Sequence, residues 1–257
     1  MISGWKGTYS GQHIKRSEVI DLSLEGNVKC FDWVDTPSYD TGGLVSNTVL
    51  VCGGKFWNDT DSDECHSLTA DASTFITKMS VARIGSASVV INDDKTLWIS
   101  GGESDVAKSS SEYINLRRSM SGPDLPVPLD GHQMVSINAT FTMIIKGPSV
   151  CYSCTGTSST FYYNHVEKTW MNGPDLSLTR KKFAAGIVTD QVTLERLVIV
   201  TGGRPKEETL VIGHHGLEMT DSTEILLEDQ WITGNTVYSG NSKHLNSEQS
   251  LISEHFW

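Results

Sequence analysis

The chain has 257 residues and a formal net charge of −11, from 20 Lys and Arg against 31 Asp and Glu. A chain of this length can bury a large core in one or two domains, and its acidic balance argues against the basic stripe that neutralises nucleic-acid phosphates. We therefore expect no nucleic-acid partner, and because no run of about 18 apolar residues is present we also expect no membrane segment.

The first predicted element is the β-rich run 17–23, which a turn and then Trp33 follow. No hydrophobic run ending in a glycine doublet precedes it. Since later parts of the chain have such a run, we predict that the chain begins inside a repeating unit and that residues 17–36 form its outer half. The opening segment 1–10 also lacks the apolar stretch of a secretory signal.

Glycine doublets then divide the sequence roughly every 50 residues. They are Gly53-Gly54, Gly101-Gly102 and Gly202-Gly203, with Gly147-Pro148 in the corresponding place of one unit. A phosphate-binding loop occurs once and leads into a helix. A doublet that recurs with no helical pattern after it is instead a structural stop, where glycine permits backbone angles that a side chain forbids.

Each unit predicts four short antiparallel strands. Hydrophobic runs stand before the doublets at 41–47, 86–92, 132–138 and 183–190, and third runs follow the loops at 62–68, 110–116, 159–165 and 222–228. A turn and often a tryptophan come next, as at Trp33, Trp170 and Trp231. Strands without intervening helices exclude a βαβ dinucleotide fold and favour sheets packed face to face.

This pattern resembles the kelch repeat, whose hallmark is a hydrophobic stretch ending in Gly-Gly, then a spaced aromatic residue and a Trp. The segments "SVAR" and "GPDLSL" are similar to those of invertebrate kelch-like proteins, and Tyr113 and Tyr163 hold the third-strand tyrosine. The resemblance implies an all-β kelch β-propeller of about five four-stranded antiparallel blades. The doublet glycines, Gly147 and the three tryptophans would then be structural residues.

The predicted blade units are roughly 1–36, 37–80, 81–122, 123–174 and 175–234. Residues 235–257 form an irregular tail with a candidate closing strand, "NTVYSG" or "SLIS". Either five blades close irregularly or the sequence is part of a six- or seven-bladed ring. We favour the second interpretation, because an open edge strand promotes aggregation.

No candidate metal site in the sequence has the full set of ligands, at the right spacing, that its metal would need. Cys151 and Cys154 have CxxC spacing without a second pair, the acidic loop 58–64 departs from a calcium loop at its glycine and glutamate positions, and His214-His215 lacks a third ligand. Copper oxidases similar to galactose oxidase need converging Tyr and His residues, but no motif here maps onto that site. The residues compared were Tyr152, Tyr162, His132 and His165. We therefore predict no catalytic residue, metal or cofactor.

Cys52 precedes the first doublet and Cys65 lies in the next strand, so adjacent antiparallel strands could bring them within disulfide distance. Two buried free thiols are the alternative. A disulfide would favour an extracellular or secreted protein over a cytoplasmic one. The sequons at Asn58 and Asn138 are candidate glycosylation sites in such a compartment.

The strands repeat whereas the loops after the doublets vary in length and charge, a pattern that suits recognition. We therefore predict a non-enzymatic module that binds a protein or a glycan through these loops. The alternatives are a kelch-like oxidase or sugar-modifying enzyme, and the substrate-recognition part of a ubiquitin-ligase adaptor.

Overall fold

The structure is a computed structural model, and it describes residues 16–21, 29–35, 41–56, 60–69, 72–104, 106–146, 158–180, 183–189, 196–203, 222–227 and 229–235. The chain divides into two compact units, Met1–Asp130 and Gly131–Trp257. Each unit is described separately below.

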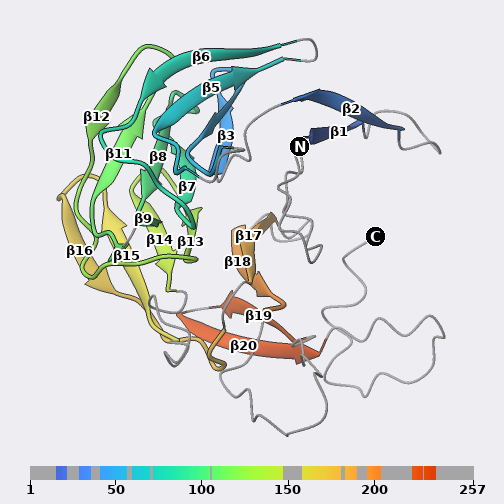
Figure 1. Cartoon of the computed structure of the whole chain (residues 1–257). Helices are drawn as coiled ribbons and strands as arrows, with labels where there is room; N and C mark the ends of the chain where they lie inside the picture. Colours follow the sequence, from blue (N-terminus) through green and yellow to red (C-terminus); the bar gives the residue numbers. More distant parts are fainter. Residues whose placement is uncertain are drawn as a thin grey trace, which may run out of the picture. The chain divides into compact units, whose positions relative to one another are not determined.

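The described part of unit 1 contains two four-stranded sheets and two two-stranded ones (Figure 1). The first four-stranded sheet joins β3 (Thr41–Val45), β4 (Thr48–Cys52), β5 (Glu64–Leu68) and β6 (Ser73–Lys78) in that order. The second joins β7 (Ala87–Ile91), β8 (Thr96–Ser100), β11 (Ser111–Ile114) and β12 (Ser119–Ser121). The hairpin β9 (Glu103–Ser104) and β10 (Val106–Ala107) lies in the loop between β8 and β11, and β1 (Arg16–Asp21) pairs with β2 (Lys29–Asp35).

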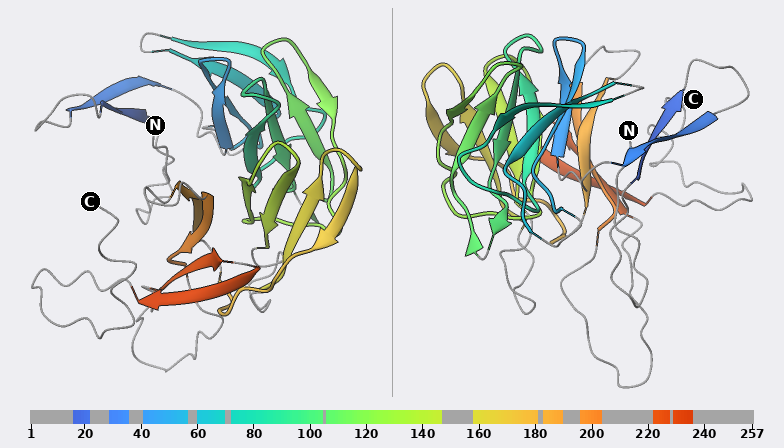
Figure 2. Two further views of the ribbon diagram at one scale, coloured as in Figure 1. Left: turned by 180° about the vertical axis from the view of Figure 1, so that it is seen from behind. Right: turned by 45° about the horizontal axis from the view of Figure 1, so that its top comes forward.

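Unit 2 repeats the same plan twice. One sheet joins β13 (Gln133–Ser136), β14 (Phe141–Ile145), β15 (Thr160–Asn164) and β16 (Thr169–Asn172). The other joins β17 (Ala184–Thr189), β18 (Arg196–Thr201), β19 (Ser222–Leu227) and β20 (Gln230–Asn235). Figure 2 shows the strands of each sheet from two further directions.

In all four of these sheets, neighbouring strands pair antiparallel in the order of the chain, with the short β9–β10 hairpin inserted between β8 and β11, and the described residues contain no helix. A four-stranded antiparallel meander is the blade of a β-propeller. The predicted all-β fold of four-stranded antiparallel blades is therefore confirmed, with about four to five blades.

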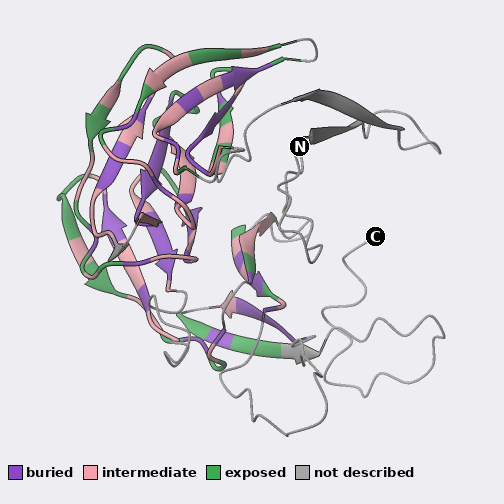
Figure 3. Cartoon of the chain, in the orientation of Figure 1, coloured by how far each residue is buried: buried purple, intermediate pink, exposed green. Residues whose placement is uncertain are grey.

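Burial is greatest in the middle strands of each sheet, and in the first three sheets the fourth strand has no buried residue (Figure 3). All five residues of β8 are buried, whereas β16 has no buried residue. The apolar residues of β4, β5, β8 and β11 form one cluster with Met79 in unit 1, and those of β13, β14 and β18 form another with Phe183 and Trp231 in unit 2. The continuous hydrophobic run of β8 is typical of a strand covered on both faces.

Gly43 lies where the first strands of the two four-stranded sheets of unit 1 approach each other. A Cβ on Gly43 would lie 2.5 Å from Cγ2 of Val90 in β7, and one on Gly42 would clash with the carbonyl oxygen of Leu50 in β4. Side chains at these positions would displace their neighbours. The close approach of β3 to β7 also allows the Thr41 hydroxyl to donate to Ser88 Oγ.

Candidate functional site

The glycine doublets end the second strands and turn the chain into the loops. The six glycines of the complete doublets have φ between 59° and 96°, a region that residues with a Cβ rarely adopt. The amides of Gly54 and Gly102 donate to the carbonyl oxygens of Arg83 and Leu129, each at 2.8 Å. Each of these two doublets thus binds the segment that leads into the next sheet. Gly147 lies outside the described residues.

Arg83 holds the loop end of the β7–β12 sheet. Its Nη1 donates to the carbonyl oxygens of Gly101 (2.7 Å) and Ser110 (3.0 Å), and its Nη2 donates to Oγ of Ser110 (2.9 Å) and Oε1 of Glu112 (3.1 Å). The arginine side chain is fully buried and that of Glu112 is 3% exposed. One guanidinium therefore ties the start of the 101–110 loop to its end.

Glu112 is also held by groups other than the arginine. Its Oε2 accepts hydrogen bonds from the hydroxyl of Ser119 (2.6 Å) and the amide of Ser80 (2.8 Å). Burial alone would raise the pKa of Glu112, but the hydrogen bonds from Ser119, Ser80 and Arg83 outweigh it and hold the pKa below its usual value. The carboxylate is thus ionised beside the guanidinium.

Arg180 repeats this arrangement in the β17–β20 sheet. Its Nη1 donates to the carbonyl oxygens of Gly202 (2.7 Å) and Ser222 (2.9 Å), its Nη2 to Ser222 Oγ (2.8 Å), and its Nε to Glu224 Oε1 (3.0 Å). Both charged side chains are fully buried. Two sheets thus fix the ends of their loops with the same buried ion pair.

The other two sheets carry different residues at these positions. In the β13–β16 repeat the sequence has Leu129 at the arginine position and Phe161 at the glutamate position, where Phe161 pairs with Ile144 as Glu112 does with Ile99. Both charges are replaced together by apolar residues. This agrees with the cost of burying one charge without its partner. In the first sheet, His66 takes the place of the glutamate.

Cys52 and Cys65 are joined by a disulfide at the loop end of the first sheet, with an S–S distance of 2.04 Å and a Cα–Cα distance of 4.1 Å. Both residues are fully buried and pair directly across β4 and β5. The same strand positions of the fourth sheet hold Thr201 and Thr223, whose hydroxyls lie 3.0 Å apart. A covalent bond therefore replaces a polar contact at the base of the acidic loop.

The described loop segments of unit 1 carry both charges. Lys55 Nζ lies 3.8 Å from Asp61 Oδ1, and Lys108 Nζ donates to the Ser104 carbonyl oxygen at 3.4 Å. Asp130 is half-buried, and burial together with the nearby Glu103 carboxylate raises its pKa above the usual value. The described loop residues of unit 1 thus include charged groups of both signs.

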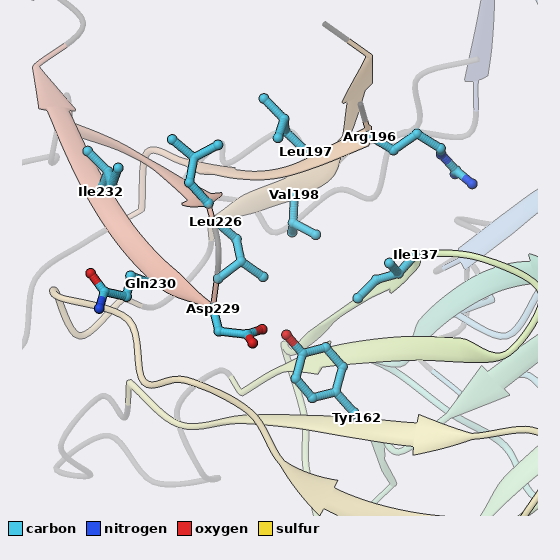
Figure 4. Close-up of a pocket in the computed structure, with 10 residues that line it drawn as sticks. Ile137, Tyr162, Arg196, Leu197, Val198, Leu226, Asp229, Gln230 and Ile232 are labelled. Atoms are coloured by element: carbon cyan, nitrogen blue, oxygen red, sulfur yellow. The ribbon is translucent and has the colours of Figure 1, made fainter. Parts of the chain in front are cut away.

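A second candidate site lies at the opposite end of the strands of unit 2. It is a pocket of about 750 Å³. Figure 4 shows Asp229 and Tyr162 facing one another at one side of it, with Val198 and Leu226 above them. The pocket residues are Ile137, Tyr162, Arg196, Leu197, Val198, Leu226, Leu227, Asp229, Gln230 and Ile232.

The tryptophans have packing roles. The Trp231 indole is 9% exposed and its Nε1 donates to the carbonyl oxygen of Pro174 at 2.9 Å, while the Trp170 ring lies 4.8 Å from the ring of Tyr163. The sequence interpretation did not single out Trp98, which is fully buried in β8 and donates to Ser111 Oγ at 2.9 Å. The sequence feature that could have identified it is a single aromatic residue between the aliphatic residues of a predicted second strand. Trp33 lies in β2, where only the backbone is described.

The residues compared with a copper site make local contacts. Burial lowers the pKa of His132 to about 3, so its imidazole is neutral at physiological pH. His165 Nε2 lies 2.8 Å from the Thr142 hydroxyl, and its ring packs edge-on against Tyr163. Tyr162 lines the pocket. No group of three or more His, Cys, Asp or Glu that could hold a metal is found among the described residues.

Asn138 is exposed in the turn between β13 and β14. Its Oδ1 accepts hydrogen bonds from the amides of Thr140 (2.8 Å) and Phe141 (2.9 Å), and a glycan would be attached to its Nδ2. The remaining sequence candidates lie outside the described residues. They are Asn58, Tyr152, Cys151, Cys154, His214, His215 and the tail beyond 235.

No family model and no curated protein matches the sequence. Among solved structures, 172 chains match. One of them, titled "Structure of YjhT", aligns with a TM-score of 0.67 at 14% sequence identity, over 88% of this chain and 78% of that chain. A likeness at this identity shows a propeller-like all-β fold and nothing of the activity. Within the described residues there is also no helix of the length and apolarity needed to span a bilayer.

Proposed function

We propose that the protein is a non-enzymatic recognition module of the kelch type, which binds a protein partner through the loops that follow its glycine doublets. The loops are the segments 53–63, 101–110, 146–159 and 202–221. The observation that carries this proposal is the contrast between the sheets and these segments. The four sheets share one strand order and closely similar pairing, whereas the four segments differ in length and in charge.

The Arg83 and Arg180 anchors support this function. Each joins the carbonyl oxygen of a doublet glycine to a residue at the far end of its loop, Ser110 for Arg83 and Ser222 for Arg180, by hydrogen bonds of 2.7 to 3.0 Å. A loop whose two ends are fixed loses less conformational entropy when a partner orders it. Rigid sheets that carry variable loops are typical of recognition proteins.

The net charge of −11 favours a basic partner. An acidic protein attracts basic proteins from a distance and raises the association rate at low ionic strength. We therefore expect the partner surface to be rich in Lys or Arg and its association rate to fall with added salt.

The test is quantitative affinity capture with matched baits of the full chain. In the loop bait, residues 103–108 are replaced by a Gly-Ser linker. In the control bait, the β7–β8 turn residues 92–94 at the other end of the same sheet are replaced by a short Asn-Gly turn. The proposal expects a specific partner that the wild type and the control capture equally and that the loop bait loses.

Equal capture of the partner by all three baits would show that residues 103–108 do not contribute to binding. Stoichiometric copper in the purified protein, together with turnover of a sugar substrate, would replace the proposal with the kelch-like oxidase alternative. A dimerisation domain in a longer form of the chain would favour the ubiquitin-ligase adaptor.

A further inference from the structure

The pocket of unit 2 lies away from the loops of the proposed function. β18 begins at Arg196 and ends at Thr201, directly before the glycine doublet. Leu197 and Val198, at the start of this strand, line the pocket. The pocket is therefore at the turn end of the sheet, and what it binds does not depend on what the loops bind.

One wall of the pocket is aliphatic. Ile137, Val198 and Leu226 belong to three different segments, and their side chains border the same space (Figure 4). Val198 is buried, while Ile137 and Leu226 pack partly buried against the core of unit 2. This wall can cover an apolar stem but offers it no hydrogen bond.

The other side combines a carboxylate with an aromatic ring. Figure 4 shows the Asp229 carboxylate and the Tyr162 hydroxyl pointing toward each other from separate sheets. Burial, and then the negative charge of Asp229, raise the pKa of Tyr162. In the described part of unit 2, Asp229 forms no ion pair and accepts no hydrogen bond from another side chain.

The nearby cation does not neutralise this carboxylate. Arg196 Nη2 donates to the carbonyl oxygen of Ser136 at 3.1 Å, and Figure 4 shows its guanidinium directed away from Asp229. The pocket therefore presents an uncompensated negative charge and a phenol hydroxyl beside an aliphatic wall.

We propose that this pocket binds the side chain of a lysine from a partner protein. The ammonium group would lie between the Asp229 carboxylate and the Tyr162 hydroxyl, where ion pairing with the carboxylate and a hydrogen bond to the phenol oxygen favour a positive charge. The four-carbon stem would lie along Ile137, Val198 and Leu226, as lysine stems do on apolar surfaces. An uncharged apolar side chain could use the wall but would leave the carboxylate in contact with apolar groups.

The test uses isotope-labelled full-length protein and four capped tripeptides of the form Gly-X-Gly, in which X is lysine, acetyl-lysine, norleucine or glutamate. Amide signals of Ile137, Val198 and Leu226 report binding. The proposal expects these signals to shift with the lysine peptide at millimolar concentration and to remain unchanged with the other three.

Because Asp229 is exposed, Asp229→Asn should weaken binding of the lysine peptide by about two- to fivefold. Asp229 has a φ of +61°, and asparagine tolerates this conformation, so the turn should be kept. Asp93→Asn is the matched control, because Asp93 is an exposed turn aspartate with a φ of +52° in unit 1. It should leave binding unchanged.

Equal binding of the norleucine and lysine peptides would show that the carboxylate does not select the ligand and would overturn the proposal. Equal loss of affinity in Asp93→Asn and Asp229→Asn would reduce the effect to net charge and also overturn it. Absence of any shift with all four peptides would show that the pocket binds no lysine side chain.

Discussion

Replacing Arg83 with methionine should lower the unfolding free energy of the β7–β12 sheet by about 3 kcal/mol. Methionine keeps much of the stem volume but removes the charge and all four hydrogen bonds of the guanidinium. At about 1.5 to 3 kcal/mol for each hydrogen bond to a charged group, the simple sum exceeds the expected loss. The measured cost of breaking a buried ion pair, about 3 to 5 kcal/mol, is the better guide.

The structure places the cost near the lower end of that range. After the substitution Glu112 would still accept hydrogen bonds from Ser80 and Ser119, and these would stabilise its negative charge. Glu112→Gln keeps an acceptor for these donors. The double variant Arg83→Met with Glu112→Gln leaves no buried charge without a partner. Its loss of unfolding free energy should therefore be smaller than the sum of the two single losses by about 2 kcal/mol.

Native-state hydrogen exchange of β8 and β11 is the appropriate assay, because a chain of two compact units need not unfold in one step. Arg118→Met, in an exposed turn of the same sheet, is the control and should change stability by less than about 0.5 kcal/mol. The argument that the ion pair anchors the loop would be refuted if the stability loss of the double variant equalled the sum of the two single losses. A loss below about 1 kcal/mol for Arg83→Met would refute it as well.

Three further predictions concern the disulfide, the Glu112 carboxylate and the first glycine doublet. The double variant Cys52→Thr and Cys65→Thr should lower the free energy of unfolding by about 2 to 3 kcal/mol, and its melting temperature should not change when reductant is added. If the melting temperature of the wild type stays the same after its disulfide has been verifiably reduced, this prediction is wrong. Glu112 has a lowered pKa, so its stabilisation is present above its unfolded pKa of about 4.3 and is lost as the pH falls through the folded value. The difference in melting temperature between wild type and Glu112→Gln should therefore shrink below about pH 4, and a constant difference from pH 3 to 7 would disprove it. Gly53→Ala should lower the free energy of unfolding by about 1 to 3 kcal/mol, because the φ of Gly53 is +69° and the new Cβ would lie 2.8 Å from the Arg83 carbonyl oxygen. The control Gly186→Ala has open space around the new Cβ and should lower it by less than about 0.5 kcal/mol, as measured by urea denaturation.

The repeated strands could be predicted from the sequence because each is a short local pattern. Alternating or continuous apolar runs and the glycines after them predict a strand and its end without knowledge of distant residues. The cysteine pairing required only that consecutive strands be neighbours, which antiparallel meanders ensure. Both inferences rest on contacts between segments close in sequence.

The arginine anchors depend on a more distant relation. Arg83 lies in the segment that enters its sheet, but its partner Glu112 is in the third strand, and the two meet only when the register of all three strands is fixed. The aligned segments "SVAR" and "SLTR" carried the signal. It was hard to recognise because the β13–β16 repeat replaces the arginine with Leu129 and the glutamate with Phe161.

The pocket of unit 2 could not be predicted for a related reason. Asp229 lies in a turn that the sequence marks only as polar, and Tyr162 belongs to a strand of the preceding sheet. Their proximity follows from packing between sheets rather than from spacing along the chain. The short β9–β10 hairpin was likewise not expected, since its four residues show no hydrophobic pattern.

The most direct test of recognition through the loops is hydrogen exchange of the full chain with and without its captured partner. We expect the partner to slow exchange in the segments 53–63 and 101–110, and in others of the loops that follow the glycine doublets. Exchange in the turns at 46–47 and 92–94 should stay unchanged. Protection confined to those turns, with unchanged exchange in every segment that follows a doublet, would contradict the account.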